Sequence, residues 1–140
     1  PPRSTLFPYT TLFRSFEEER EEGHQFTAEQ VSVLIGLTDG LKGNLVIGFK
    51  RSTALQIVSL MMGGMEVKEM DFMAQSAIGE LANMTLGSAL MKLKAEAIIN
   101  LSPPTVVMGE EMHLMVGGAK SRKLFFNMNG EPFNIIVAVD

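Results

Sequence analysis

Three polar residues in the middle of the 140-residue sequence are spaced so that a helix would present them together. Glu80 and Asn83 are three residues apart, and Ser76 precedes Glu80 by one helical turn. Residues at these spacings are neighbours on a helix surface. The residues around them are small or flexible and include Ala77, Gly79, Met84 and Gly87. Glycine inside a helix costs about 1 kcal/mol relative to alanine, so the two glycines indicate that another backbone approaches this face closely.

A carboxylate beside an amide suits phosphoryl transfer, in which a protein mainly positions water and balances charge. The amide of Asn83 can donate one hydrogen bond and accept another, and so hold a water in line with a phosphorus atom. The carboxylate of Glu80 can bind a lysine of a partner protein. A Glu and an Asn at this spacing more often belong to an ordinary solvated helix surface, so the spacing alone leaves both interpretations open.

Composition narrows the possible classes of protein. Apolar residues make up 46% of the chain and charged residues 20%, which is typical of a globular domain. No run of 18 apolar residues is present, so we expect no membrane span. The net charge of −4 argues against nucleic acid as a partner. The absence of cysteine excludes disulfides and thiolate metal sites and fits a cytoplasmic protein. His24 and His113 are isolated, so we expect no metal site.

Two helices are expected to position the polar residues. The longer should run from about Lys68 to about Lys94. At about 100° per residue, one side of it is the expected core face, formed by Ile78, Leu81, Ala82, Thr85, Leu86, Ala89 and Leu93. The other side carries Met73, Ser76, Ala77, Glu80, Asn83, Met84, Gly87 and Met91. A shorter helix should run from Thr53, with Gln56 as the second half of a capping box, to Met62 before two glycines.

The remaining apolar runs read as strands joined largely by tight turns. Asp39-Gly40 and Asn129-Gly130 are typical hairpin turns. The fold class that we predict is therefore α+β, with a largely antiparallel β-sheet packed against two main helices. The expected strands cover residues 31–37, 44–49, 97–102, 105–108, 113–116, 123–128 and 133–139.

The first fifteen residues differ from the rest of the chain. They contain a near-repeat, STLF followed by TTLF, and lack the features of a signal peptide. We expect residues 1–15 to be a non-native or disordered leader and residues 16–140 to form a single domain. The eleven methionines are expected mostly in an adaptable core, with a peptide-binding groove on the methionine-rich helix face as the less favoured interpretation.

The segment SAIGELANMTLGSA, which begins at Ser76, resembles the active-site helix of the CheC/CheX/FliY phosphatases. Their motif is Asp or Ser, three residues, Glu, two residues, Asn and, further on, Pro. Ser76, Glu80 and Asn83 match the first positions, and Pro103 or Pro104 comes slightly early. Further similar stretches follow in the same order, at residues 33–43, 53–59 and 104–109. CheC-like relatives carry the motif twice, so a single copy is similar to the CheX branch.

The resemblance implies a chemotaxis phosphatase that removes the phosphoryl group from the aspartyl phosphate of a CheY-like response regulator. Glu80 would pair with the active-site lysine of that partner, and Asn83 would orient the hydrolytic water. The partner would also contact Ser76, Ala77, Met84 and Gly87. The chain itself would bind no cofactor, because the response regulator carries the Mg²⁺, and it would form a homodimer. The alternative is a catalytically silent module of the same fold that binds a response regulator or a flagellar switch component.

Overall fold

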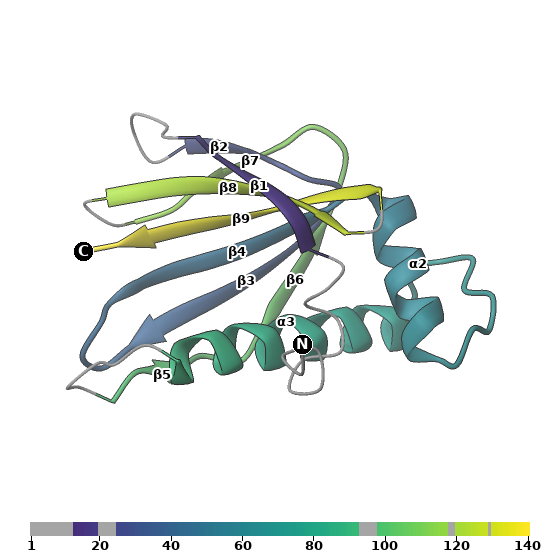
Figure 1. Ribbon diagram of the computed structural model, residues 1–140, viewed down its shortest axis with the longest axis horizontal. Coiled ribbons are helices and arrows are strands. Elements are labelled where there is room, and N and C mark those ends of the chain that lie inside the picture. The colour runs from purple at the N-terminus through teal and green to yellow at the C-terminus, as the bar shows by residue number, and fades with distance from the viewer. Residues whose placement is uncertain (1–12, 20–24, 93–97, 118–119, 129) are drawn as a thin grey trace.

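The computed structural model describes residues 13–19, 25–92, 98–117, 120–128 and 130–140. Two helices and nine strands occur in these parts of the chain (Figure 1). In chain order they are β1 (Phe13–Glu19), β2 (Gln25–Ala28), β3 (Val31–Thr38), β4 (Gly43–Phe49), α2 (Arg51–Met61), α3 (Phe72–Met91), β5 (Asn100–Leu101), β6 (Thr105–Met108), β7 (Met112–Met115), β8 (Lys120–Met128) and β9 (Glu131–Val139).

The main sheet is antiparallel throughout, and its strand order is β1-β8-β9-β4-β3-β5. β6 also pairs with β3, beyond β5 along the same edge. The hairpin between β3 and β4 turns at Asp39 and Gly40, with φ angles of 60° and 74°, as predicted. Gly130 has a φ of 87° in the turn between β8 and β9, while Asn129 lies outside the described residues. The predicted α+β class is confirmed.

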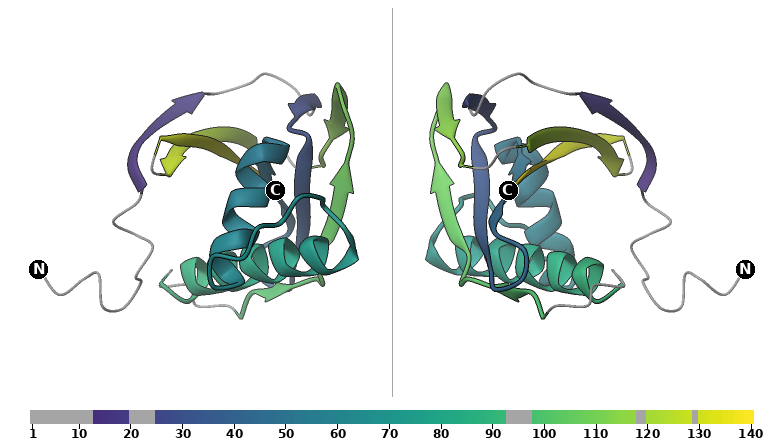
Figure 2. Two further views of the ribbon diagram at one scale, coloured as in Figure 1. Left: turned by 90° about the vertical axis from the view of Figure 1, so that its right-hand side faces the viewer. Right: turned by 90° about the vertical axis from the view of Figure 1, so that its left-hand side faces the viewer.

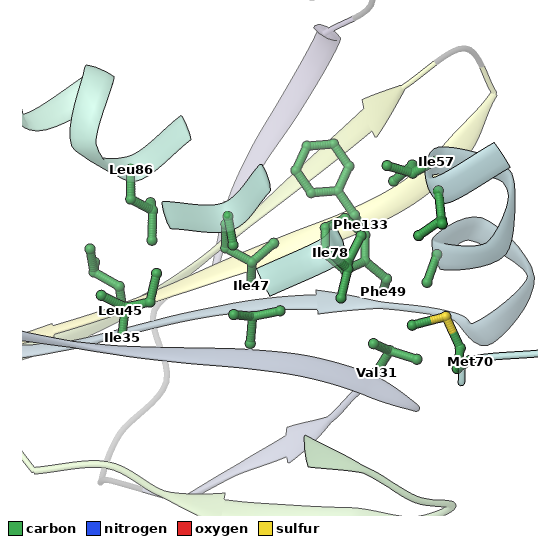
Figure 3. Close-up of a cluster of buried hydrophobic side chains, with 14 of the residues drawn as sticks. Val31, Ile35, Leu45, Ile47, Phe49, Ile57, Met70, Ile78, Leu86 and Phe133 are labelled. Carbon is green, nitrogen blue, oxygen red and sulfur yellow. The ribbon is translucent and has the colours of Figure 1, made fainter. Parts of the chain in front are cut away.

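The core lies between the main sheet and the two helices, and the sheet curves around them (Figure 2). The side chains of β3 alternate, so Val31, Val33, Ile35 and Leu37 all point to the helices and are buried. They meet Ile57 of α2 and Ile78 of α3 in one apolar cluster (Figure 3). Burial of this face is what holds both helices on the sheet.

A separate two-stranded sheet of β2 and β7 provides a smaller core. Phe26 of β2 is buried together with Val46 of β4 and Ile136 of β9. Val46 and Ile136 alternate along their strands with the residues that face the helices. The two-stranded sheet of β2 and β7 therefore covers the opposite face of the main sheet. The predicted strand at residues 113–116 corresponds closely to β7, whereas no strand was predicted at β2.

Helix α3 begins at Phe72, so the predicted start at Lys68 is wrong. The carboxylate of Asp71 accepts a hydrogen bond of 2.9 Å from the backbone N–H of Ala74, which is the contact of an N-cap residue. Three of the seven residues expected on the core face are buried, namely Ile78, Ala82 and Leu86, and Leu81 and Thr85 are half-buried. Ala89 was also expected there but is exposed, and Leu93 lies outside the described residues, as does the predicted end near Lys94.

Helix α2 begins at Arg51, two residues before the predicted start, and the predicted capping box is wrong. Lys50 occupies the N-cap position and makes no capping hydrogen bond with its side chain. The hydroxyl of Thr53 instead donates to Glu131 of β9, at 3.1 Å. After α2 the chain turns at Gly63 and Gly64, both with positive φ, as predicted.

Strand β1 pairs with β8 and includes residues 13–15 of the predicted leader. Residues 1–12 lie outside the described residues, so the division at residue 15 stays a prediction. Among the residues that the structure describes, no helix is long and apolar enough to cross a membrane.

Replacing Ile57 by Ala should lower the free energy of unfolding by about 3 kcal/mol, because the deletion leaves a cavity between α2 and the sheet. Urea denaturation followed by circular dichroism would measure the change. Leu60→Ala is the matched control, since Leu60 lies on the same helix but is 67% exposed. That substitution should change stability by less than about 0.5 kcal/mol. Equal losses in the two variants would contradict the packing of α2.

Candidate functional site

The outward face of α3 carries the polar residues that the spacing singled out. Glu80 and Ser76 are exposed there, and Asn83 is half-buried. Ile78 and Ala82, on the opposite side of the helix, are buried against the sheet and fix its rotation. The structure therefore brings Ser76, Glu80 and Asn83 together on one accessible surface, as predicted.

Glu80 is the only charged residue in the twenty residues of α3, all of which the structure describes. An ordinary solvated helix face carries many charged residues. In the described parts of the chain, the side chains of Glu80 and Asn83 form no hydrogen bond or ion pair. The helix therefore presents one carboxylate and one amide whose hydrogen-bonding groups are available to a binding partner. This arrangement argues against the interpretation of the pair as ordinary solvated surface.

Two glycines lie one turn before and one turn after Asn83. Both face the edge of the main sheet, formed by residues 100–108 of the same chain. A Cβ on Gly79 would lie 3.4 Å from Val106 Cγ2 and 3.5 Å from Pro104 Cγ. A Cβ on Gly87 would lie 3.8 Å from Leu101 Cδ1. These are ordinary van der Waals distances, so the chain's own edge packs beside both positions, but neither position requires glycine for this contact.

The structure distinguishes the two prolines that could complete the sequence motif. Pro104 packs on Gly79, the residue directly before Glu80. Pro103 is exposed and has no such contact with Gly79. Pro104 is therefore the proline that lies against the helix turn carrying the acidic residue.

Large apolar side chains surround the polar pair on the same helix. Met73 and Met84 are each 59% exposed, and Ala77 is half-buried. Phe72 is 85% exposed, although exposed phenylalanine is uncommon on a free surface. Phe72 was not among the residues predicted for this face, because the predicted helix start lies four residues before the observed one. Had Asp71 been identified as the N-cap, Phe72 would have been placed one turn before Ser76.

The site offers a carboxylate, an amide and a hydroxyl for chemistry. Among the described residues, no group of three or more His, Cys, Asp and Glu side chains could hold a metal ion. An amide is neither acid nor base near neutral pH, and Glu80 has no titratable neighbour bonded to it within the described chain. A carboxylate and an amide on one face can bind a partner's charged group and position a water.

Comparison with known proteins identifies relatives that match over most of the chain. The sequence model of the family described as "Chemotaxis phosphatase CheX" matches residues 31–128. The CheY-P phosphatase CheX of Thermotoga maritima is 40% identical over 138 residues, which cover 94% of this chain and 89% of that protein.

Solved structures share the fold at lower sequence identity. A chemotactic CheC-like protein from Shewanella oneidensis has a TM-score of 0.77 and 22% identity, over 98% of this chain and 91% of the other. The CheX–CheY–BeF₃–Mg²⁺ complex from Borrelia burgdorferi has a TM-score of 0.74 and 19% identity, over 94% and 86%. With the family match over most of the chain and the Thermotoga relative, these findings show that the chain belongs to the chemotaxis phosphatase CheX family.

Proposed function

We propose that this chain hydrolyses the aspartyl phosphate of a CheY-like response regulator in chemotaxis signalling. Membership of the family supports the proposal, and the similar protein from Thermotoga maritima is named a CheY-P phosphatase. The observation in the structure that carries it is the outward face of α3. There Glu80 and Asn83 stand side by side, unbonded within the described chain, on a helix with no other charge.

In the proposed reaction Asn83 orients the attacking water. Its side-chain oxygen accepts a hydrogen bond from the water, so that an oxygen lone pair points at the phosphorus atom. The new O–P bond forms while the bond from phosphorus to the regulator's aspartate breaks, and that aspartate leaves as a carboxylate. The amide takes no proton, so the water's proton departs with inorganic phosphate or to solvent. The chain's contribution is geometry, which suits the loose transition state of phosphoryl transfer.

Glu80 has the role of aligning the two proteins. Its carboxylate is exposed before docking and lies one turn from Asn83. A lysine of the regulator that pairs with it would fix the position of Asn83 over the phosphoryl group. Ser76, Ala77 and Met84 border the pair and would contact the regulator, with Phe72 and Met73 extending the apolar part of this surface. Gly87 is half-buried beside Leu101 and could contact the regulator only at its margin.

Three further expectations belong to the same proposal. The Mg²⁺ required for the reaction is held by the regulator, as the composition of the Borrelia burgdorferi complex suggests. The chain forms a homodimer, which the family resemblance supports. It works in the cytoplasm, which fits a sequence without cysteine.

The test of the proposal is the rate at which a CheY-like regulator, radiolabelled on its phosphoryl group, loses phosphate in the presence of Mg²⁺. The wild-type chain should accelerate the loss of phosphate. In Asn83→Ala the accelerated rate should fall at least about 100-fold, as expected when a positioning group is lost. Its fold and its affinity for the regulator should be largely unchanged. Gln56→Ala, which removes an exposed amide from α2, is the control and should keep full activity. Binding without any acceleration by the wild type would instead favour the catalytically silent module.

Replacing Glu80 by Gln removes the charge but keeps the size of the side chain. We expect association with the regulator to weaken about tenfold or more, since a charge-assisted hydrogen bond contributes about 1.5–3 kcal/mol, and the rate to fall as well. Added salt should weaken binding of the wild type more than that of the variant, because salt screens the missing attraction. Titration calorimetry at two salt concentrations would measure both effects. Glu66→Gln, an exposed control on the loop before α3, should behave as the wild type.

The apolar residues of the face should affect binding rather than chemistry. Met84→Gln or Phe72→Ser should raise KM for the phosphorylated regulator several-fold and leave kcat within about twofold, because uniform binding energy is lost. Steady-state kinetics over a range of regulator concentrations would separate the two constants. Met115→Gln is the matched control, since Met115 is 82% exposed on β7. A fall in kcat alone would place these residues in the reaction itself.

A further inference from the structure

The edge of the sheet that faces α3 is interrupted by a one-residue bulge. β5 pairs Leu101 with Leu37, whereas β6 pairs Thr105 with Leu34. Two residues of β3 therefore lie opposite three residues of the edge, namely residues 102–104. Such bulges redirect side chains and are common next to active sites.

The extra residue decides which side chains of the edge face the helix. Leu101 pairs with Leu37, whose side chain points into the core. Strict alternation after Leu101 would turn residues 103 and 105 to the helix, but the bulge shifts the pattern by one residue. As a result Pro104 and Val106 face α3 and contact Gly79. Leu101 lies near Gly87, so the bulge runs beside the helix turn between the two glycines, which carries Asn83.

The hydroxyl of Ser102 stabilises the bulge on both sides. The backbone N–H of Ser102 donates to the carbonyl of Gly36, at 2.9 Å. In a regular ladder the N–H of Gly36 would donate back to the carbonyl of Ser102, but here it donates to Ser102 Oγ, at 2.7 Å. The same hydroxyl donates to the carbonyl of Pro103, at 3.2 Å. The two prolines have no N–H to offer, so the backbone N–H and the hydroxyl of Ser102 together join the bulge to β3.

We propose that Ser102 is a positioning residue of the phosphatase site. The Ser102 hydroxyl takes the place of the Ser102 carbonyl as the acceptor for the N–H of Gly36. This allows the chain to bulge, and the bulge holds Pro104 and Val106 against Gly79. That contact sets the turn of α3 from which Glu80 and Asn83 project. Ser102 itself touches no reacting atom, and the proposal rests on the function proposed above. Positioning errors of about 1 Å can cost about 100-fold in rate, so a loosened bulge should be visible in the kinetics.

The experiment compares Ser102→Ala, which loses both hydrogen bonds of the hydroxyl, with Ser102→Thr, which keeps them. The alanine variant should lower kcat for dephosphorylation about tenfold or more and raise KM by a smaller factor, because the turn that carries Asn83 and Glu80 shifts while the apolar residues of the docking face keep their places. Threonine should restore most of the activity. Thr38→Ala is the matched control: the Thr38 hydroxyl donates to Asn100 across the same edge, at 3.4 Å, but outside the bulge. That control should keep the wild-type kcat.

A second variant reaches the same hydroxyl from the other strand. A Cβ on Gly36 would lie 3.2 Å from Ser102 Oγ, so Gly36→Ala should displace the hydroxyl and reproduce the loss. The double variant should lose no more than either single one, since both act through one contact. All rates are taken well below the unfolding temperature of each variant. A loss that only follows the unfolded fraction, or a wild-type kcat in Ser102→Ala, would overturn the proposal.

A readout without any regulator separates this proposal from the proposed function. In ¹⁵N-labelled protein, Ser102→Ala should speed hydrogen exchange at the Gly36 amide and shift the backbone signals of Gly79, Glu80 and the side-chain amide of Asn83. Ser102→Thr should return them. If these signals stay in place, the positioning role is wrong whatever the activity. If they move while the wild type accelerates no dephosphorylation, the structural link stands and the proposed function fails.

Discussion

The packing of α3 against the edge of the sheet is the constraint on which the site depends. Ile78 is fully buried on one side of the helix, and Pro104 and Val106 pack beside Gly79. These contacts fix both the rotation and the height of the helix over the sheet, because interiors are close-packed and transmit small displacements. The orientation of Glu80 and Asn83 follows from them without any direct support of either side chain.

In the proposed complex, the lack of other charges on α3 would restrict where a partner's cation can pair with this helix. Glu80 is alone on an otherwise neutral helix, so a partner's cation has one place at which to pair. Charged groups across an interface set register and partner choice more than raw affinity. In the proposed reaction the chain supplies one charge, one amide and an apolar surface, and the regulator supplies the reacting group. Such a site is complete only when the two proteins meet.

Much of the fold could be predicted because its signals are local. The Asp39-Gly40 turn and the two glycines after α2 depend on backbone preferences of single residues, and the structure has positive φ at all four. Features that depend on distant residues were missed. The cap of α2 was assigned wrongly because Thr53 bonds to Glu131 on another strand. β2 was missed because four residues carry little pattern, and its partner β7 is far along the chain.

The same division holds for the site. The grouping of Ser76, Glu80 and Asn83 could be determined from the sequence alone, because their spacing matches the helical repeat and needs no other part of the chain. Tertiary structure decided the rest: which proline lies against the helix, and that the two glycines face the sheet edge. The bulge at Ser102 exists only in the pairing of residues 102–104 with β3, more than sixty residues earlier. Pairings between distant segments leave no periodic trace in the sequence, so only the folded chain reveals them.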